Sequence, residues 1–298
     1  MSNQIDTAFV QQYSANVQML AQQSGSRLRN AVRIENVVGK NAFIDQVGVA
    51  TAQLRASRHA DTPQMDTPHA RRRLSLADYE YADLIDDQDK VRMLIDPTSS
   101  YAMAAANAMG RAIDDVIITA FDAAASTGET GSTSTVFDTN QDVAVSVGGA
   151  DTNMNLTKLR EAKKLLDEAD VDPSIPRYIV VGPSQIHALL ADTSVTSADF
   201  NTVKALVQGE INEFMGFNFI MSNRLTPLES GNVRKCFAFA QEGITLGIGK
   251  DVSARVDERA DKGYATQVYY CMSIGATRMQ ENMVVRIKCD EDDLDGAA

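Results

Sequence analysis

Apolar residues recur with helical spacing over one long stretch of the chain, residues 97–127. Apolar side chains fall at every third or fourth position from 101 to 124, with polar and charged residues on the opposite side. This spacing places a continuous apolar stripe along one side of an α-helix. Pro97 and the hydroxyl residues after it are a start signal, and Gly128 is a stop signal. The pattern predicts a long amphipathic helix over 97–127.

Weaker patterns occupy the chain before this helix. Residues 4–24 carry apolar side chains at helical spacing and predict an amphipathic helix. Residues 32–49 alternate β-favouring and polar residues and predict strands. Residues 52–73 have almost no large apolar side chains and contain two Thr-Pro steps, which predict a long projecting loop or hairpin. Residues 74–95 mix strand and helix signals.

The middle third alternates helix and strand as a compact α/β unit. After a strand at 142–147, Gly148 and Gly149 indicate a domain boundary. The elements expected beyond it are helices at 155–169, 184–190 and 199–208 and strands at 177–183 and 217–223. The last third predicts strands at 236–240, 244–248, 252–259, 267–274 and 283–288, with a disordered acidic tail after 290. The fold class is therefore α+β.

Length and composition support a folded protein. The chain has 298 residues, 44% of them hydrophobic, enough for one large or two ordinary domains with a real core. No stretch is long and apolar enough to span a membrane, and no export signal begins the sequence. Cys236, Cys271 and Cys289 are odd in number and far apart, so we expect three buried, reduced thiols that fill the core.

Charge is strongly negative overall but segregated locally. A net charge of −12 argues against a general nucleic-acid binder, because affinity for phosphate depends on clustered cations. The exception is a basic island made of Arg55, Arg58, His59, His69, Arg71, Arg72 and Arg73. An acidic run follows it, made of Asp78, Glu80, Asp83, Asp86, Asp87 and Asp89. This pattern suits complementary contacts between copies of the chain, although solvated charge is the commoner meaning of either run.

Candidate chemistry is sparse. The sequence has three histidines, no Gly-x-Ser-x-Gly elbow and no Cys-x-x-Cys pair. The glycines of 243–250 fit no phosphate-binding fingerprint and suit a strand with small residues. The acidic run lacks the ligand spacing of a calcium loop. We therefore expect no catalytic residue, metal site or cofactor, and no enzyme activity. The alternative is a cytoplasmic enzyme with a dispersed site around His187 and the strand at 216–224.

The order of parts, supported by several local strings, resembles a known family. Residues 176–190 (PRYIVVGPSQIHALL), 209–223 (GEINEFMGFNFIMSN), and 263–270 with 282–287 occur in the order found in the major capsid protein of tailed bacteriophages, the Hong Kong phage capsid fold. The resemblance covers nearly the whole chain. It implies a viral structural protein of the bacteriophage virion, assembled in the bacterial host cytoplasm into hexamers and pentamers of an icosahedral shell around double-stranded DNA. An encapsulin-type cargo shell shares this fold and is the nearer alternative.

The resemblance also implies a division of the chain and a set of partners. The expected parts are an N-terminal arm (1–40), an extended loop (41–79), a peripheral domain (80–149) with a spine helix at 97–127, an axial domain (150–247), returning peripheral strands (248–290) and a tail (291–298). The expected partners are many copies of the chain, a portal protein and a separate scaffolding protein, because the arm starts at Met1 and strand signals begin by Val32. The resemblance leaves room for a decoration protein, allows only non-specific contact with packaged DNA and implies no membrane.

The basic island supplies a hypothesis for contacts between subunits. Some relatives join subunits through a lysine on the extended loop, but no lysine lies between Asn41 and Asp89. Noncovalent contact must then suffice, and guanidinium groups bind carboxylates in bidentate geometry. We expect Arg55, Arg58, Arg71, Arg72 and Arg73 to meet acidic residues of an adjacent subunit. The acidic candidates are Asp83, Asp86, Asp87, Asp114 and Asp115.

Overall fold

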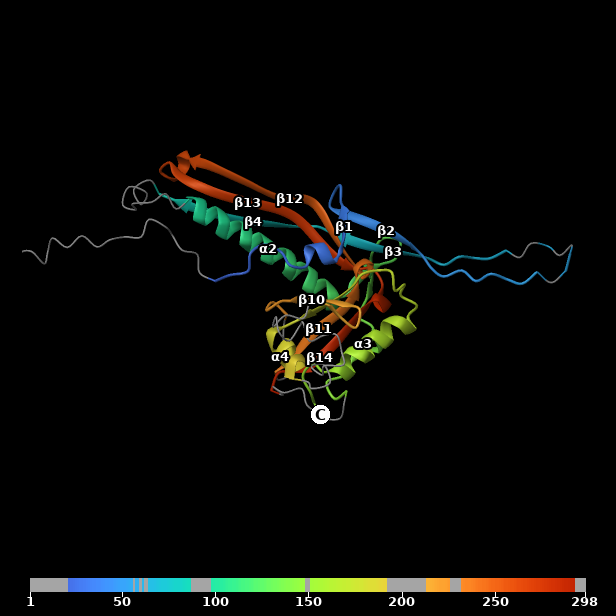
Figure 1. The fold of residues 1–298 in the computed structure, drawn as a ribbon. Coiled ribbons are helices and arrows are strands. Elements are labelled where there is room, and N and C mark those ends of the chain that lie inside the picture. The colour runs from blue at the N-terminus through green and yellow to red at the C-terminus, as the bar shows by residue number, and fades with distance from the viewer. Residues whose placement is uncertain are drawn as a thin grey trace, which may run out of the picture. The chain divides into compact units, whose positions relative to one another are not determined.

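The computed structural model describes residues 21–55, 57–58, 61, 64–86, 98–147, 151–191, 213–225 and 232–292 (Figure 1). Its α-helices within these residues are α2 (Thr98–Asp122), α3 (Leu156–Glu168) and α4 (Pro183–Ala191). The long helix expected at 97–127 is therefore confirmed, although it ends at Asp122. The helices expected at 4–24 and 199–208, and most of the tail, lie outside the described residues.

Three sheets account for the strands of the described residues. One has the order β1-β12-β13-β4, from Arg33–Asn36, Ile244–Arg259, Ala265–Arg278 and Ala77–Ile85. Another has the order β7-β14-β11-β8-β10-β9, from Asp142–Val143, Val284–Asp290, Val233–Ala240, Arg177–Val181, Phe217–Met221 and Glu213–Phe214. The third has the order β2-β3-β5-β6, from Asn41–Val47, His69–Ser75, Ala125–Thr127 and Thr133–Thr135.

Contacts divide the chain into two compact units. Unit 1 contains 1–26, 78–112 and 250–273, and unit 2 contains 27–77, 113–249 and 274–298. The boundaries between arm, extended loop, peripheral domain, axial domain and tail stay predictions. Unit 2 contains the expected axial residues 150–247 together with most of the expected extended loop.

In unit 1, the amino-terminal segment lies against α2. The backbone N–H of Gly25 donates to the Asn107 side chain at 3.3 Å. A Cβ atom at Gly110 would overlap the Gly25 backbone. Glycine costs roughly 1 kcal/mol relative to alanine inside a helix. The close approach of the two backbones explains why α2 carries one at this position.

The core of unit 2 is the six-stranded sheet, with a helix on each face. Phe121 of α2 stacks on Phe237 of β11 with ring centroids 4.8 Å apart, and it also meets Phe239. The alternate residues of β11 point to the opposite face, where Cys236 is buried near Lys158 of α3. Both faces are therefore covered, which explains the nearly continuous apolar sequence of β11. Figure 1 shows α3 beside β14 and β11.

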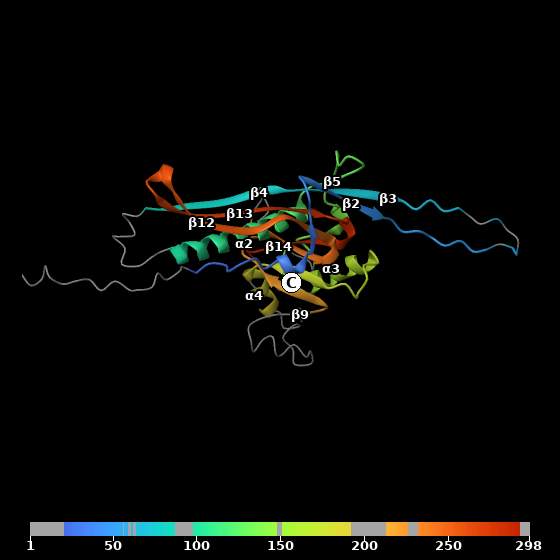
Figure 2. The ribbon, with the colours of Figure 1, turned by 90° about the horizontal axis from the view of Figure 1, so that it is seen from above.

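The charged stretch expected as loop is partly strand. β2 and β3 pair antiparallel from Asn41↔Ser75 to Val47↔His69, and we call this pair the β2–β3 ribbon (Figures 1 and 2). A Cβ atom at Gly247 would overlap the Leu74 side chain of β3, so the glycine leaves room for Leu74. Residues 244–250 lie in strand β12, as predicted, and Gly243 directly precedes it. The expectation of a hairpin is confirmed, but the strand starts at His69.

Three further expectations need correction. Residues 125–127 are strand β5, paired with β3, because the Ser126 and Thr127 backbones bond to Arg73 and Arg72 and do not extend the helix. The strand expected at 142–147 shortens to Asp142–Val143 before the chain turns. Cys271 is half exposed, whereas Cys236 and Cys289 are buried as predicted. Within the described residues, no helix has the length and apolar character that crossing a membrane requires.

Candidate functional site: the ribbon arginines and the network behind them

The three consecutive arginines point to opposite faces of the β2–β3 ribbon. Arg71 lies opposite Asp45 and Arg73 opposite Phe43, whereas Arg72 lies opposite Ile44. Successive side chains of a strand alternate between its faces, so Arg71 and Arg73 share one face and Arg72 occupies the other. The sequence run therefore forms two chemically different sites.

Arg71 belongs to an exposed cluster on the ribbon. Its Nε donates to Asp45 Oδ1 at 2.5 Å, and its guanidinium lies 5.6 Å from the centre of the Phe43 ring. The hydrogen bond from Arg71 lowers the pKa of Asp45. The Arg71 side chain remains 40% exposed despite these contacts. Its orientation is thus set in advance while its guanidinium stays accessible.

Arg72 fastens the other face of the ribbon inside unit 2. Only 6% of its surface is exposed, and its guanidinium donates to both carboxylate oxygens of Glu281 at 2.6 and 2.7 Å. Its Nε donates to the Met279 carbonyl at 3.0 Å, and Gln46 of β2 donates to the same carbonyl at 2.8 Å. The expectation that Arg72 meets a neighbouring subunit is not supported, because these contacts within the chain bury its side chain.

Arg73 and the loop arginines differ from Arg72. Arg73 is half-buried, and its guanidinium lies 3.5 Å from the Ser126 hydroxyl. Arg55 and Arg58 are exposed, and Arg55 donates to the carbonyls of Ser57 and Arg58. No acidic side chain of the described residues forms an ion pair with any of these three arginines, so their guanidinium groups can meet carboxylates of another subunit.

The expected acidic residues also divide. Asp114 is fully buried and accepts the backbone N–H groups of Arg27 and Leu28, each at 3.1 Å. It holds the amino-terminal segment of unit 2 and is inaccessible to a neighbour. Asp115 forms a bidentate ion pair with Arg224 and stays partly exposed. Asp83 is half-buried, Asp86 is exposed, and Asp87 lies outside the described residues.

A groove opens on the Arg71 face of the ribbon, at the end where β2 leads into the loop. Its volume is about 800 Å³, and Asp45, Val47, His69 and Arg71 line it on the ribbon side. Residues 127–129 and Thr133 of the β5–β6 hairpin complete the wall. The lining mixes both signs of charge with an apolar side chain, a composition that fits the polar rim of a protein interface.

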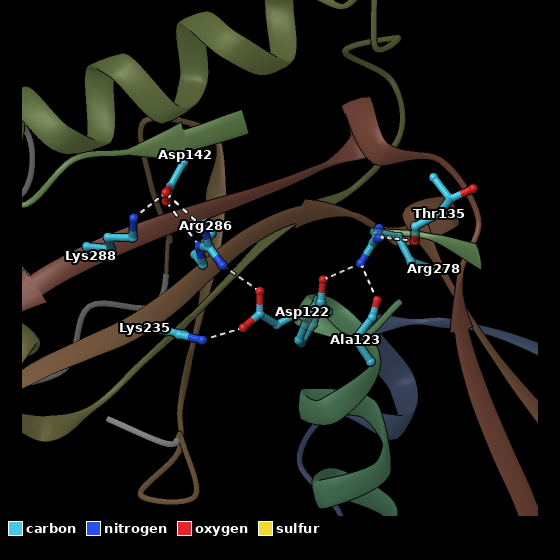
Figure 3. Close-up of polar contacts among 9 residues, drawn as sticks. Asp122, Ala123, Thr135, Asp142, Lys235, Arg278, Arg286 and Lys288 are labelled. Atoms are coloured by element: carbon cyan, nitrogen blue, oxygen red, sulfur yellow. Dashed lines mark hydrogen bonds and ion pairs between the residues drawn. The ribbon is translucent and has the colours of Figure 1, made fainter. Parts of the chain in front are cut away.

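A charged network at the end of α2 was missed by the sequence reasoning (Figure 3). Asp122, the last residue of α2, pairs with Lys235 and with Arg286. Asp142 pairs with the same Arg286 and with Lys288. Burial raises the pKa of Asp122, but Lys235 and Arg286 outweigh it and the net pKa is lowered. Arg286 and Lys288 stand two positions apart in a strand, and this spacing is the signal that they share a face.

Arg278 completes this network by terminating α2. It is 1% exposed and donates to the carbonyls of Phe121 and Ala123 at 2.8 and 2.9 Å (Figure 3). The last carbonyls of a helix lack partners within it and carry partial negative charge. The buried Arg278 guanidinium donates hydrogen bonds to these carbonyls and offsets their partial negative charge. These contacts fix the end of α2 on the sheet.

No enzyme-like constellation accompanies these features in the described part of the chain. His187 is exposed on α4, and the strand expected at 216–224 forms the sheet strand β10 beside β8. The described residues hold no group of three His, Cys, Asp or Glu side chains that could bind a metal ion. The arrangement is suited to holding elements together and to presenting charged surfaces.

Comparisons with known proteins agree with this character. Residues 5–291 match the sequence model of the family described as phage capsid protein. No curated protein sequence matches the chain.

Several solved structures share the fold. The capsid of cyanophage P-SCSP1u superposes with a TM-score of 0.77 at 15% identity, covering 97% of this chain and 95% of that one. The head of Helicobacter pylori bacteriophage KHP40 gives 0.74 at 11% identity, covering 95% and 96%. The capsid of Ralstonia phage GP4 gives 0.73 at 9% identity, covering 95% of each. At such identities the likeness is one of fold.

The family match spans nearly the whole sequence, and the α+β fold agrees with it over the same length. The family match supports a virion shell over the two alternatives, a cargo shell and an enzyme. The chain therefore belongs to the phage capsid protein family and is a structural protein of the bacteriophage virion, where the capsid is built from many copies of it.

Proposed function

We propose that this capsid protein forms hexamers and pentamers that close into an icosahedral head around double-stranded DNA, in the cytoplasm of a bacterial host. Membership of the phage capsid protein family and the shared fold support the proposal. Identical chains that contact one another head to tail around an axis form closed rings. The net charge of −12 favours non-specific, weak contact with the packaged DNA.

The subunit contacts in this proposal use the arginines of the ribbon and its loop that are not fully buried. Arg71, Arg73, Arg55 and Arg58 meet carboxylates of an adjacent subunit, drawn from Asp83, Asp86, Asp87 and Asp115. The observation that carries the proposal is the division of the ribbon. Arg72 anchors one face to Glu281, while the opposite face presents Arg71 beside an open groove. Arg72 and Asp114 are left out of this contact set because both are buried.

The proposed assembly includes other proteins of the head. A separate scaffolding protein guides the shell, a portal protein occupies one vertex, and a decoration protein can bind outside. Assembly of the chain with and without a co-expressed scaffolding protein tests the first partner. We expect regular shells only with it. Mature particles whose subunits have all lost residues 1–30 by proteolysis would contradict a separate scaffold.

The double variant Arg71→Ala with Arg73→Ala tests the contact surface. We expect a folded subunit with a normal melting temperature, and shells that fail to form or that dissociate at lower salt than the wild type, since exposed ion pairs are screened by salt. Sedimentation and electron microscopy at several salt concentrations measure this.

Arg33→Ala is the matched control, because it removes an exposed arginine that is paired with Glu35 on β1. If the double variant and the control assemble alike at every salt concentration, the ribbon arginines are not the contact. A wild-type chain that stays a monodisperse monomer in the presence of the other head proteins would refute the assembly itself.

A further inference from the structure

Among the described residues, nothing pairs with one edge of strand β12 along most of its length. β1 pairs with it only over Thr245–Ile248, and β13 occupies its other edge. No other described residues form a strand against the open edge from 249 to 259 (Figure 1). Residues 254–258 are also exposed on both faces of the sheet. Such an edge carries unpaired N–H and C=O groups and can accept a further strand.

The direction of the backbone groups along this edge can be assigned. The carbonyl of Ile248 accepts the N–H of Val37, so it points to the β1 side. The carbonyl of Arg259 accepts the N–H of Tyr264, so it points to the β13 side. The N–H and C=O of one residue point to the same edge, and the edge alternates from residue to residue. Even-numbered residues from 250 to 258 therefore present their backbone groups to the open edge.

The side chains of this segment are complementary to a second copy of the same segment. The sequence from 251 to 260 is Asp-Val-Ser-Ala-Arg-Val-Asp-Glu-Arg-Ala. In an antiparallel pair centred on Val256, each Arg255 lies opposite Asp257 of the other copy, and Val256 lies opposite itself. Ala254 lies opposite Glu258 in the same register. Centring the pair on Arg255 would instead oppose two arginines.

We propose that two copies of this chain join β12 to β12 along this edge, antiparallel, about a two-fold axis at Val256. The even-numbered residue Val256 exchanges both backbone hydrogen bonds with its counterpart. The Arg255–Asp257 pairs then occupy the positions without backbone hydrogen bonds, where cross-strand side chains approach most closely. Val252, Ala254, Val256 and Glu258 lie on one face of the joined sheet and the Arg255–Asp257 ion pairs on the other.

The two charged side chains at the centre of the proposed pair are exposed. Arg255 and Asp257 are both exposed, and neither takes part in an ion pair within the described residues. Val256 is 50% exposed and Val252 36%. The opposite edge of the sheet, β4, carries Asp78, Glu80 and Asp83 without a cation. A second β4 would place like charges together, which disfavours pairing there and selects β12.

The inference rests on the proposed assembly and adds a second kind of contact to it. Head-to-tail contacts form rings, but rings must also be joined to one another. A two-fold contact uses the same surface on both copies and can join two rings. The partner of the β12 edge is therefore the β12 edge of a subunit in the neighbouring ring.

Cysteine pairing tests the register in assembled shells. In a Cys271→Ser background, Val256→Cys puts two thiols at a hydrogen-bonded cross-strand pair, where Cα atoms are about 5.5 Å apart and a disulfide is feasible. A mild oxidant accepts two electrons and two protons as the S–S bond forms. We expect most chains to run as dimers on a non-reducing denaturing gel and as monomers after reduction.

Val252→Cys in the same background is the matched control. Its two copies would lie about 27 Å apart in the proposed register, at about 3.4 Å per residue, and should not cross-link. Combining Ala254→Cys with Glu258→Cys should restore the dimer, because these positions are opposite within β12. Equal cross-linking of Val256→Cys and Val252→Cys, or none of either in intact shells, would overturn the register.

Charge reversal tests the same contact without thiols. Arg255→Asp would place two carboxylates opposite each other at both symmetry-related positions, and Asp257→Arg would place two guanidinium groups there. Each single variant should therefore lose shells at salt concentrations that the wild type tolerates. The double variant restores opposite charges and should restore assembly. Single variants that assemble like the wild type would refute the inference while leaving the shell function intact, whereas a wild type that forms no shells would refute the function itself.

Discussion

Adjacent residues can have unrelated roles, and Arg71 and Arg72 are the example. Arg72 is buried with Glu281, whereas Arg71 is exposed with Asp45. Arg72→Ala should lower the free energy of unfolding by about 3 kcal/mol, at the low end for breaking a buried ion pair, because Arg278 keeps Glu281 partly paired at 3.6 Å. Arg71→Ala should leave it almost unchanged. Denaturant unfolding of both variants measures this, and equal stability would show that Arg72 does not anchor the ribbon.

Cysteine reactivity is the second residue-scale prediction. A hydrogen bond from Lys250, whose Nζ lies 3.0 Å from the sulfur, lowers the pKa of Cys271 below 9.0. Burial raises the pKa of Cys236. Because the thiolate is the reactive form, a disulfide reagent at neutral pH should modify Cys271 rapidly and the two buried cysteines only after unfolding.

Replacing the lysine isolates its effect on the thiol. Lys250→Met should slow the reaction of Cys271 at neutral pH and move the midpoint of its pH–rate profile upward. Lys262→Met is the control, because it removes an exposed lysine elsewhere in unit 1. An unchanged midpoint in Lys250→Met would show that the lysine does not stabilise the thiolate.

At the scale of elements, the end of α2 predicts a response to acid. Lys235 and Arg286 lower the pKa of Asp122 below 3.8 against the opposing effect of burial. The stabilisation is therefore fully present above the unfolded value of 3.8 and is lost as the pH falls through the lower folded value. Between pH 5 and about pH 2, the free energy of unfolding should fall more for the wild type than for Asp122→Asn. Asp86→Asn, an exposed change, should follow the wild type, and coincident curves for all three would refute the role of Asp122.

At the scale of the whole molecule, the lysine distribution predicts how subunits are held. No lysine lies between 41 and 89, so the ribbon and its loop carry no amine for a covalent link to a neighbour. Mature particles should therefore give one band at the monomer mass on a reducing denaturing gel. Comparison with the same sample run without reductant distinguishes disulfide links from other covalent links. A ladder of multimers that survives reduction would show covalent joining and refute purely noncovalent contact.

Local periodicity alone determined much of the fold. The apolar stripe of α2, the buried strand at β8 and the capped helix α3 each follow from the spacing of side chains within one element. The absence of catalytic motifs could also be read from the sequence, whereas the indication of a capsid protein came from a family resemblance in the order of parts. These features depend on residues close together in sequence, where spacing and burial are directly linked.

Tertiary structure decided which charges are free and which are anchored. Asp122 meets Lys235 and Arg286, which are 113 and 164 positions away, and Arg72 meets Glu281 at a separation of 209. Cys271 on β13 stays half exposed, whereas Cys236 on the central strand β11 is buried. Composition and spacing contain no record of such partners, because burial and ion pairing arise from long-range packing that the local pattern permits but does not specify.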